Sequence, residues 1–470
     1  MGAYRMRRRT VLAGGVLASA LALTGTFPAF AAPLSPDKAR EVDAIAAEVL
    51  AATGAPSASV AIVEDGEPVY AKAYGLARLS PAVPATTSTR YGIASVSKQF
   101  TAAAILLLVE DGKVSLDDPV GRYVPGLTDG DRITLRQVLS HTAGYRDYWP
   151  QDFVFEAMRA PTTQQKILDG WARIPLDYPP GEQWRYSNTG FVIAGLVVEK
   201  VAGEPLFAFL KRRIFDPLGM SGVTEDDSKA LSPPDAGHYT RYGLGPVVAA
   251  DKEGPGWLFG AAELAMSPSD LARWNWAMIR RELLKPASWE AMTTSVELSS
   301  GAPAGYGLGV SVKVRDGVTS ISHGGMLSGV LTSNTVWPGE KRAVTVVSNA
   351  DFGEPQTAIS QRIAFLLRPS TGATATARTL VAQLQAGTID QALLTANGKA
   401  WFTAARLADF KRSLFPLGPL RMLEGQGVQV RGGMTWHGFD AAFGGRTLSV
   451  SMRLTPDGRV EQFLIGPKAG

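Results

Sequence analysis

Residues 91–110 of this 470-residue chain read YGIASVSKQFTAAAILLLVE. The apolar run from Ala102 to Val109 predicts a helix that stops at Gly112. Ser95 and Lys98 stand at the start of this helix in an S-x-x-K pattern. Because residues three apart share one face of a helix, the Lys98 amine is predicted to lie beside the Ser95 hydroxyl.

This spacing is suited to a nucleophilic serine. A free hydroxyl is a poor nucleophile, and a lysine amine can accept its proton when the surroundings lower the lysine pKa. The N-terminus of the helix also directs backbone N–H groups toward a developing oxyanion. The pattern alone is weak, because Ser35 and Lys38 repeat it at a predicted helix cap. Taken alone, Ser95 is explained equally well as a plain N-cap beside a solvated lysine.

A second segment adds a tyrosine and an amide. Tyr186 alone among the 12 tyrosines is followed two places later by an asparagine, Asn188. Beside a protonated Lys98 the phenolate is favoured, so Tyr186 is predicted to act as a general base near neutral pH. The Asn188 amide can donate to the lysine environment or to a substrate carbonyl. The alternative is a buried tyrosine whose hydroxyl is only hydrogen-bonded.

A third segment, His323-Gly324-Gly325, ends a predicted strand. Glycine at this place lets a substrate lie against the strand edge, and the N–H of Met326 can supply a second oxyanion donor. Taken singly, His323 is better explained as an edge-strand histidine without a catalytic role.

The ordered set Ser95-x-x-Lys98, Tyr186-x-Asn188 and His323-x-Gly325 resembles the serine β-lactamase and penicillin-binding superfamily, specifically its class C-like branch of serine hydrolases. The resemblance covers residues 38–367. Three further segments also resemble sequences of this branch: Tyr91–Ala94, Leu139–Gly144 and Ser267–Ala272.

The resemblance implies an acyl-enzyme mechanism. Ser95 would attack a carbonyl, Lys98 and Tyr186 would move its proton, and the N–H groups of Ser95 and Met326 would hold the oxyanion. Asn188, His323 and Gly325 would bind or orient the substrate. By the same resemblance, His141 is expected to shape the cleft and not to react.

One departure from the family pattern bears on the substrate. Many β-lactamases carry Lys-Thr-Gly at the third segment, where the cation pairs with a substrate carboxylate, whereas this chain has a mostly neutral histidine. Similar branches with His-x-Gly include D-amino-acid-specific peptidases, and related esterases vary this position. We therefore expect a secreted serine hydrolase that cleaves an ester or amide, with small D-amino-acid peptides or simple esters as substrates.

Three other functions are weighed against this one. A β-lactamase or DD-peptidase uses the same residues. A penicillin-recognising binding or sensor protein would be acylated without turnover. An α/β-hydrolase is not supported, because the chain contains no G-x-S-x-G elbow.

The pattern of strands and helices predicts an α+β fold. β-prone runs precede the serine segment and return at residues 306–314, 318–322, 330–337 and 343–348, with a mostly helical region inserted between them. We expect an antiparallel sheet that joins both ends and is flanked by helices. The predicted divisions are a signal peptide at residues 1–31, a serine hydrolase domain at 32–368, a linker at 369–376 and a small α+β accessory domain at 377–470.

Composition limits the chemistry and the partners. The chain has no cysteine and only four scattered histidines, so thiolate and zinc-type metal sites are not expected, although a carboxylate site stays open. No cofactor is expected. Of its 47 Lys and Arg residues, four lie within residues 5–9, which leaves 43 against 43 Asp and Glu. Without a basic excess, nucleic acid is not an expected partner. The expected partner is a small-molecule or short-peptide substrate, and the oligomeric state is not predicted.

The N-terminus predicts export. Basic residues 5–9 precede an apolar stretch, and Ala29-Phe30-Ala31 offers a cleavage site, which together form a signal peptide. Arg8-Arg9 further resembles a twin-arginine signal. The mature protein is expected to be periplasmic or extracellular, without a membrane span.

Overall fold

The computed structural model describes residues 33–468 except residues 152, 229, 316, 369 and 371. The predicted signal peptide lies outside the described residues. Within them, no helix has both the length and the apolar character that a membrane span needs.

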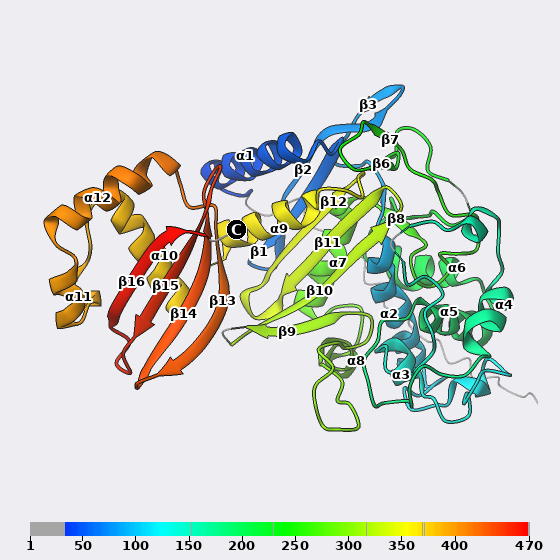
Figure 1. Cartoon of the computed structure of the whole chain (residues 1–470). Helices are drawn as coiled ribbons and strands as arrows, with labels where there is room; N and C mark the ends of the chain where they lie inside the picture. Colours follow the sequence, from blue (N-terminus) through cyan, green and yellow to red (C-terminus); the bar gives the residue numbers. More distant parts are fainter. Residues whose placement is uncertain are drawn as a thin grey trace, which may run out of the picture.

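A seven-stranded antiparallel sheet joins the two ends of the predicted hydrolase domain (Figure 1). Its strand order is β3-β2-β1-β12-β11-β10-β9, and the pairing of β1 with β12 brings the N-terminal and C-terminal segments together. This arrangement confirms the predicted α+β fold. The strands are β1 (Ser57–Glu64), β2 (Glu67–Leu79), β3 (Ala82–Pro84), β9 (Ser311–Arg315), β10 (Val318–Leu327), β11 (Val330–Trp337) and β12 (Arg342–Ser348).

Helices cover both faces of this sheet. Helices α1 (Pro36–Thr53) and α9 (Pro355–Leu367) pack on one face, and α7 (Pro268–Arg280) packs on the other. Strand β1 is therefore buried over almost its whole length. Helix α1 has proline at its first position and ends at Gly54, whose φ of +73° is the left-handed conformation that terminates helices.

The inserted region is mostly helical and surrounds one central helix. Helix α2 (Lys98–Glu110) is buried along most of its length and packs against α5 (Asn188–Ala202). The other elements of this region are α3 (Leu135–Leu139), α4 (Gln164–Ile167), α6 (Leu206–Leu210), α8 (Pro286–Thr293), β4 (Tyr91–Gly92), β5 (Thr224–Glu225), β6 (Tyr239–Arg241), β7 (Val247–Ala249) and β8 (Leu264–Met266).

Strand β9 is shorter than the sequence predicted. It begins at Ser311 and not at residue 306. Gly309 adopts a φ of +72°, and a Cβ at Gly307 would lie 2.1 Å from the carbonyl oxygen of Met292. The chain therefore forms a tight loop before β9, which apolar patterning does not reveal.

The C-terminal residues form a second α+β unit with its own apolar core. Its four-stranded antiparallel sheet has the order β13-β14-β15-β16, and Figure 1 shows it beside α1 and α9. Arg421 connects it to α1 through ion pairs of 3.0 Å with Glu41 and Glu48. The elements are α10 (Gly372–Ala386), α11 (Ala396–Trp401), α12 (Ala404–Leu414), β13 (Met422–Arg431), β14 (Met434–Ala442), β15 (Thr447–Leu454) and β16 (Val460–Pro467).

Helix α10 begins at Gly372, inside the segment 369–376 that was predicted to be a linker. Its later turns bury Leu380 and Leu384 in the core of the C-terminal unit, and alanines among residues 373–377 let the helix extend backward. Residues 372–376 of the predicted linker are therefore helical. The division of the chain into two independent domains stays a prediction.

Candidate active site

Ser95 lies in a strained turn directly before the central helix. It is the second residue of the short 3-10 helix η1 (Ala94–Ser97), which leads into α2. The preceding Ala94 has a φ of +51°, a conformation that is rare for residues with a Cβ atom and often found at functional sites. Ser95 lines a cavity of about 780 Å³. The turn thus places the hydroxyl at a cavity wall while α2 continues into the core.

Lys98 is fully buried and has three hydrogen-bond acceptors around its amine. Its Nζ lies 3.2 Å from Ser95 Oγ, 2.7 Å from Asn188 Oδ1 and 2.9 Å from the carbonyl oxygen of Ala261. Of these three partners, only the Ser95 hydroxyl can also donate a proton. A neutral Lys98 therefore keeps N–H bonds to the two carbonyl oxygens and turns its lone pair to Ser95.

The surroundings of Lys98 are mostly apolar. Its Nζ lies 4.9 Å from the ring centroid of Tyr186 and 5.4 Å from that of Phe191. Burial lowers the pKa of Lys98 from 10.5 to about 7, and the negative charge of Asp147 opposes this shift. The amine can therefore both accept and return a proton near neutral pH.

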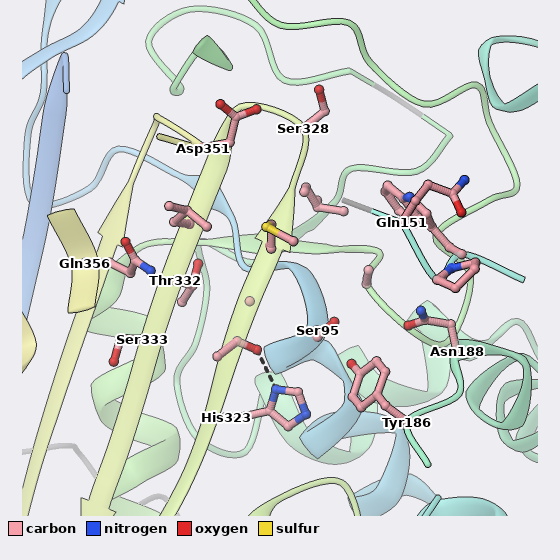
Figure 2. Close-up of a pocket in the computed structure, with 18 of the residues that line it drawn as sticks. Ser95, Gln151, Tyr186, Asn188, His323, Ser328, Thr332, Ser333, Asp351 and Gln356 are labelled. Carbon is pink, nitrogen blue, oxygen red and sulfur yellow. Dashed lines mark hydrogen bonds between the residues drawn. The ribbon is translucent and has the colours of Figure 1, made fainter. Parts of the chain in front are cut away.

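Tyr186 keeps its proton in this environment. Figure 2 shows its hydroxyl directed toward Ser95, although the two oxygens form no hydrogen bond of normal geometry. Burial raises the pKa of Tyr186, and its interaction with the Ser95 hydroxyl offsets this only in part. The predicted phenolate is therefore wrong, because burial disfavours the charged form of the tyrosine. A protonated Tyr186 is instead a proton donor.

Asn188 is oriented by a residue that the sequence motifs do not include. Asp147 accepts hydrogen bonds from the backbone N–H of Asn188 at 3.0 Å and from its Nδ2 at 3.1 Å. The amide therefore donates to Asp147 and presents its oxygen to Lys98, which differs from the expected donation to the lysine environment or to a substrate carbonyl. A signal for Asp147 was available, since it is an acid within the aromatic stretch 145–149, just after the family phrase 139–144.

Strand β10 forms the wall opposite Tyr186 and has a free edge. Its pairing with β9 ends at Ser322, so the stretch 323–327 has a strand partner on one side only within the described structure. Leu327 and Val330 flank the two-residue turn of the β10–β11 hairpin, and such a flanking pair exchanges backbone hydrogen bonds. In antiparallel strands hydrogen-bonded and non-hydrogen-bonded pairs alternate, so the next pair, Met326 and Leu331, is not hydrogen-bonded. By this alternation the N–H of Met326 faces the free edge, as an oxyanion donor requires.

Gly325 lets β10 approach the serine turn. A Cβ atom at this position would lie 2.4 Å from the carbonyl oxygen of Ile93 and 3.0 Å from the Cβ of Ala94. Any larger residue would push the strand away from Ser95. The glycine therefore sets the distance between the free edge and the nucleophile.

His323 is neutral and fixed in one tautomer. Its Nδ1 donates to the carbonyl oxygen of Gly324 at 2.5 Å (Figure 2), so its Nε2 accepts from the Tyr306 hydroxyl at 2.8 Å. Burial and repulsion from Lys98 lower the pKa of His323 to about 4. The third motif therefore brings no positive charge to the cavity at neutral pH.

His141 lies behind Tyr186 and does not line the cavity. Its ring centroid is 4.3 Å from that of Tyr186, and its Nδ1 accepts the N–H of Ser187 at 3.2 Å. Burial lowers the pKa of His141 well below its ordinary value, so this histidine is neutral. Its contacts agree with the predicted role of shaping the cleft.

The cavity wall carries negative charge. Asp147, Asp351 and Glu354 line it, and no lysine or arginine of the described chain does. Gln356 adds a buried amide oxygen that has no hydrogen-bond partner. No described residue of the C-terminal unit lines the cavity. Such a wall favours neutral or cationic ligands over carboxylates.

Comparison with known proteins places this site in a family. The Beta-lactamase family model matches residues 42–368. Penicillin-binding protein 4* of Bacillus subtilis is 29% identical over 62% of this chain and 68% of its own. D-aminopeptidase of Cereibacter sphaeroides is 31% identical over 63% of this chain, which spans 57% of that protein.

A solved structure agrees with the family match. The D-stereospecific amidohydrolase from Streptomyces sp. superposes with a TM-score of 0.60 and 29% identity, over 72% of this chain and 100% of its own. The matched region contains all three motifs, and it ends where the C-terminal unit begins. The chain therefore belongs to the beta-lactamase family of serine hydrolases.

Proposed function

We propose that this protein is an exported hydrolase that cleaves small amides and esters, those of D-amino acids in particular, through an acyl-Ser95 intermediate. The observation that carries the proposal is the 3.2 Å contact between the buried Lys98 amine and the Ser95 hydroxyl. Export is inferred from the N-terminal sequence pattern alone. The names of two similar proteins, a D-aminopeptidase and a D-stereospecific amidohydrolase, support the choice of substrate.

Acylation follows from these contacts. Neutral Lys98 takes the Ser95 proton as Oγ bonds to the substrate carbonyl carbon, and the carbonyl electron pair moves onto oxygen. The N–H groups of Ser95 and Met326 stabilise this oxyanion. When the carbonyl re-forms, the bond to the leaving group breaks. Tyr186 gives its proton to that group and regains one from Lys98.

Deacylation reverses the roles with water as the nucleophile. Lys98, neutral again after the leaving group departs, accepts a proton from water through Tyr186. The resulting hydroxide adds to the acyl carbon, and Ser95 Oγ leaves as Lys98 returns the proton to it. The free acid and the starting enzyme result.

The charges of the cavity support amides and esters over β-lactams. A substrate carboxylate would find neutral His323 and the carboxyl groups of Asp351 and Glu354 at the wall of the cavity that Ser95 lines. An ammonium group of an unblocked amino acid would instead be attracted to the two carboxylates. We therefore expect D-aminoacyl amides with a free amine to react faster than their N-acylated forms.

Covalent labelling tests the nucleophile. A fluorophosphonate should label the wild-type protein, and Ser95→Ala should abolish the labelling. Ser97→Ala and Ser35→Ala are matched controls that should keep it, since Ser97 Oγ accepts the backbone N–H of Leu264 and Ser35 is only the N-cap of α1. Labelling that persists in Ser95→Ala would reject the proposed nucleophile.

A substrate panel tests the reaction class. It should include D- and L-alanine p-nitroanilide, N-acetyl-D-alanine p-nitroanilide, p-nitrophenyl acetate and a chromogenic cephalosporin. Fastest turnover of the unblocked D-anilide or the ester supports the proposal. Fastest turnover of the cephalosporin would establish a β-lactamase, and a burst without steady-state turnover would establish a sensor.

A further inference from the structure

We propose that Asp147 is a positioning residue that fixes the Asn188 amide and thereby holds the Lys98 amine beside Ser95. This inference rests on the proposed function in one respect, namely that Lys98 exchanges a proton with Ser95. None of the three sequence motifs contains Asp147, which comes from the loop between α3 and α4.

The Asp147 carboxylate is committed to Asn188. Its Oδ1 accepts the Asn188 backbone N–H at 3.0 Å and Nδ2 at 3.1 Å, and its Oδ2 lies 3.3 Å from the same Nδ2. The N–H of Trp149 also donates to Oδ1, at 3.1 Å, which closes the loop around the carboxylate. One acidic side chain therefore holds both the backbone and the side chain at the start of α5.

This commitment decides which end of the amide faces Lys98. An asparagine can present either its oxygen or its NH₂ group, and only the oxygen can accept from the Lys98 amine. A carboxylate only accepts, so Asp147 takes the NH₂ group and leaves the oxygen 2.7 Å from Lys98 Nζ. Without Asp147, the amide can rotate and the amine loses one of its two carbonyl partners.

Asp147 also supplies the charge that faces Lys98. The other titratable side chains that interact with this amine are Tyr186, whose pKa is raised, and His141 and His323, whose pKa values are lowered, so all three are neutral at neutral pH. The negative charge of Asp147 raises the pKa of Lys98 against the effect of burial. Burial in turn raises the pKa of Asp147, so the two groups titrate together.

The test uses three variants: a single substitution of Asp147, a double variant that exchanges the side chains at 147 and 188, and a control. Asp147→Asn removes the charge and the acceptor-only group. The double variant Asp147→Asn/Asn188→Asp returns a carboxylate, now directly beside Lys98. Asp177→Asn is the matched control, because Asp177 lies on the neighbouring surface and pairs with Arg146 at 2.8 Å.

Two readouts follow each variant across about pH 5 to about pH 9. One is the rate of Ser95 labelling by a fluorophosphonate. The other is the ¹³C chemical shift of the Lys98 Cε in protein grown with ¹³C-lysine, assigned by its loss in Lys98→Ala. The second readout reports the lysine pKa without any turnover.

The single and the double Asp147 variant are expected to shift the Lys98 pKa in opposite directions. Asp147→Asn should slow labelling about a hundredfold at its optimum and lower the Lys98 pKa by about one. The double variant should raise the Lys98 pKa above the wild-type value, and Asp177→Asn should match wild type in both readouts. A purely structural role would slow labelling in both Asp147 variants and leave the lysine titration where it was.

Two outcomes would overturn the inference. The first is a wild-type Lys98 titration in Asp147→Asn, and the second is a shift in the same direction in both Asp147 variants. Failure of the proposed function looks different, because wild-type Ser95 would then not be labelled at any pH. The ¹³C titration of Lys98 would still decide the role of Asp147 in that case.

Discussion

The pH dependence of acylation tests Lys98 as the proton acceptor. Its pKa of about 7 means that the neutral amine is about half populated at pH 7. The neutral fraction then falls to about a tenth at pH 6 and about a hundredth at pH 5. If this amine accepts the Ser95 proton, the acylation rate should fall by the same factors, about fivefold from pH 7 to pH 6 and about tenfold from pH 6 to pH 5.

The assay is the second-order rate constant for fluorophosphonate labelling, because the charge of the probe does not change over this range. The same fall in rate at acid pH should appear in kcat/KM for p-nitrophenyl acetate, whose pH dependence reports the pKa values of the free enzyme. His323 titrates at about 4 and lies below the range. A rate that stays flat from about pH 5 to about pH 8 would refute the role of Lys98.

One neighbouring carboxyl group has to be separated from Lys98. Burial raises the pKa of Glu253 to about 7, and its Oε1 lies 3.4 Å from the backbone N of Ser328, in the hairpin turn that follows β10. Glu253→Gln removes this titration and keeps an acceptor for that N–H. The fall in labelling rate at acid pH, the acid limb of the profile, should be unchanged in this variant. Its disappearance would assign the limb to Glu253 and not to Lys98.

Two further predictions concern Gly325 and Tyr186. Gly325→Ala should destabilise the fold by about 1–3 kcal/mol and lower turnover, because its Cβ would meet the Ile93 carbonyl oxygen at 2.4 Å. Gly324→Ala, whose Cβ would find only Thr332 O at 3.8 Å, should melt like wild type. Tyr186→Phe should change stability by less than about 1 kcal/mol, since the hydroxyl makes no hydrogen bond of normal geometry, yet reduce turnover about a hundredfold. Wild-type turnover in Tyr186→Phe would leave the tyrosine a packing role.

Local patterning predicted the sheet well because its strands are bounded by clear turns. The pairing of β1 with β12 follows from strands at both ends of the inserted helical region. The errors lie where backbone conformation depends on distant atoms. The loop before β9 exists because Gly307 meets Met292, and α10 extends to Gly372 because its later turns are buried.

The residues of the site were predictable, but their protonation was not. Helix spacing placed Lys98 beside Ser95, and the resemblance to the family implied that Tyr186 and His323 would join them. The predicted Tyr186 phenolate failed because its charge depends on burial, which residue types do not encode. Asp147 was missed for a related reason, because its contact with Asn188 joins segments 41 positions apart.

Burial leaves few groups near Ser95 that change protonation near neutral pH. The pKa values of Tyr186, His141 and His323 are all shifted toward the neutral form, so among these neighbours of Ser95 it is Lys98, coupled to Asp147, that changes protonation near neutral pH. Amide cleavage needs one proton removed from the nucleophile and one delivered to the leaving amine. A single buried pair can remove one proton and then deliver one, provided that the lysine pKa stays close to neutral pH. This requirement explains why a carboxylate lies one amide away from the lysine.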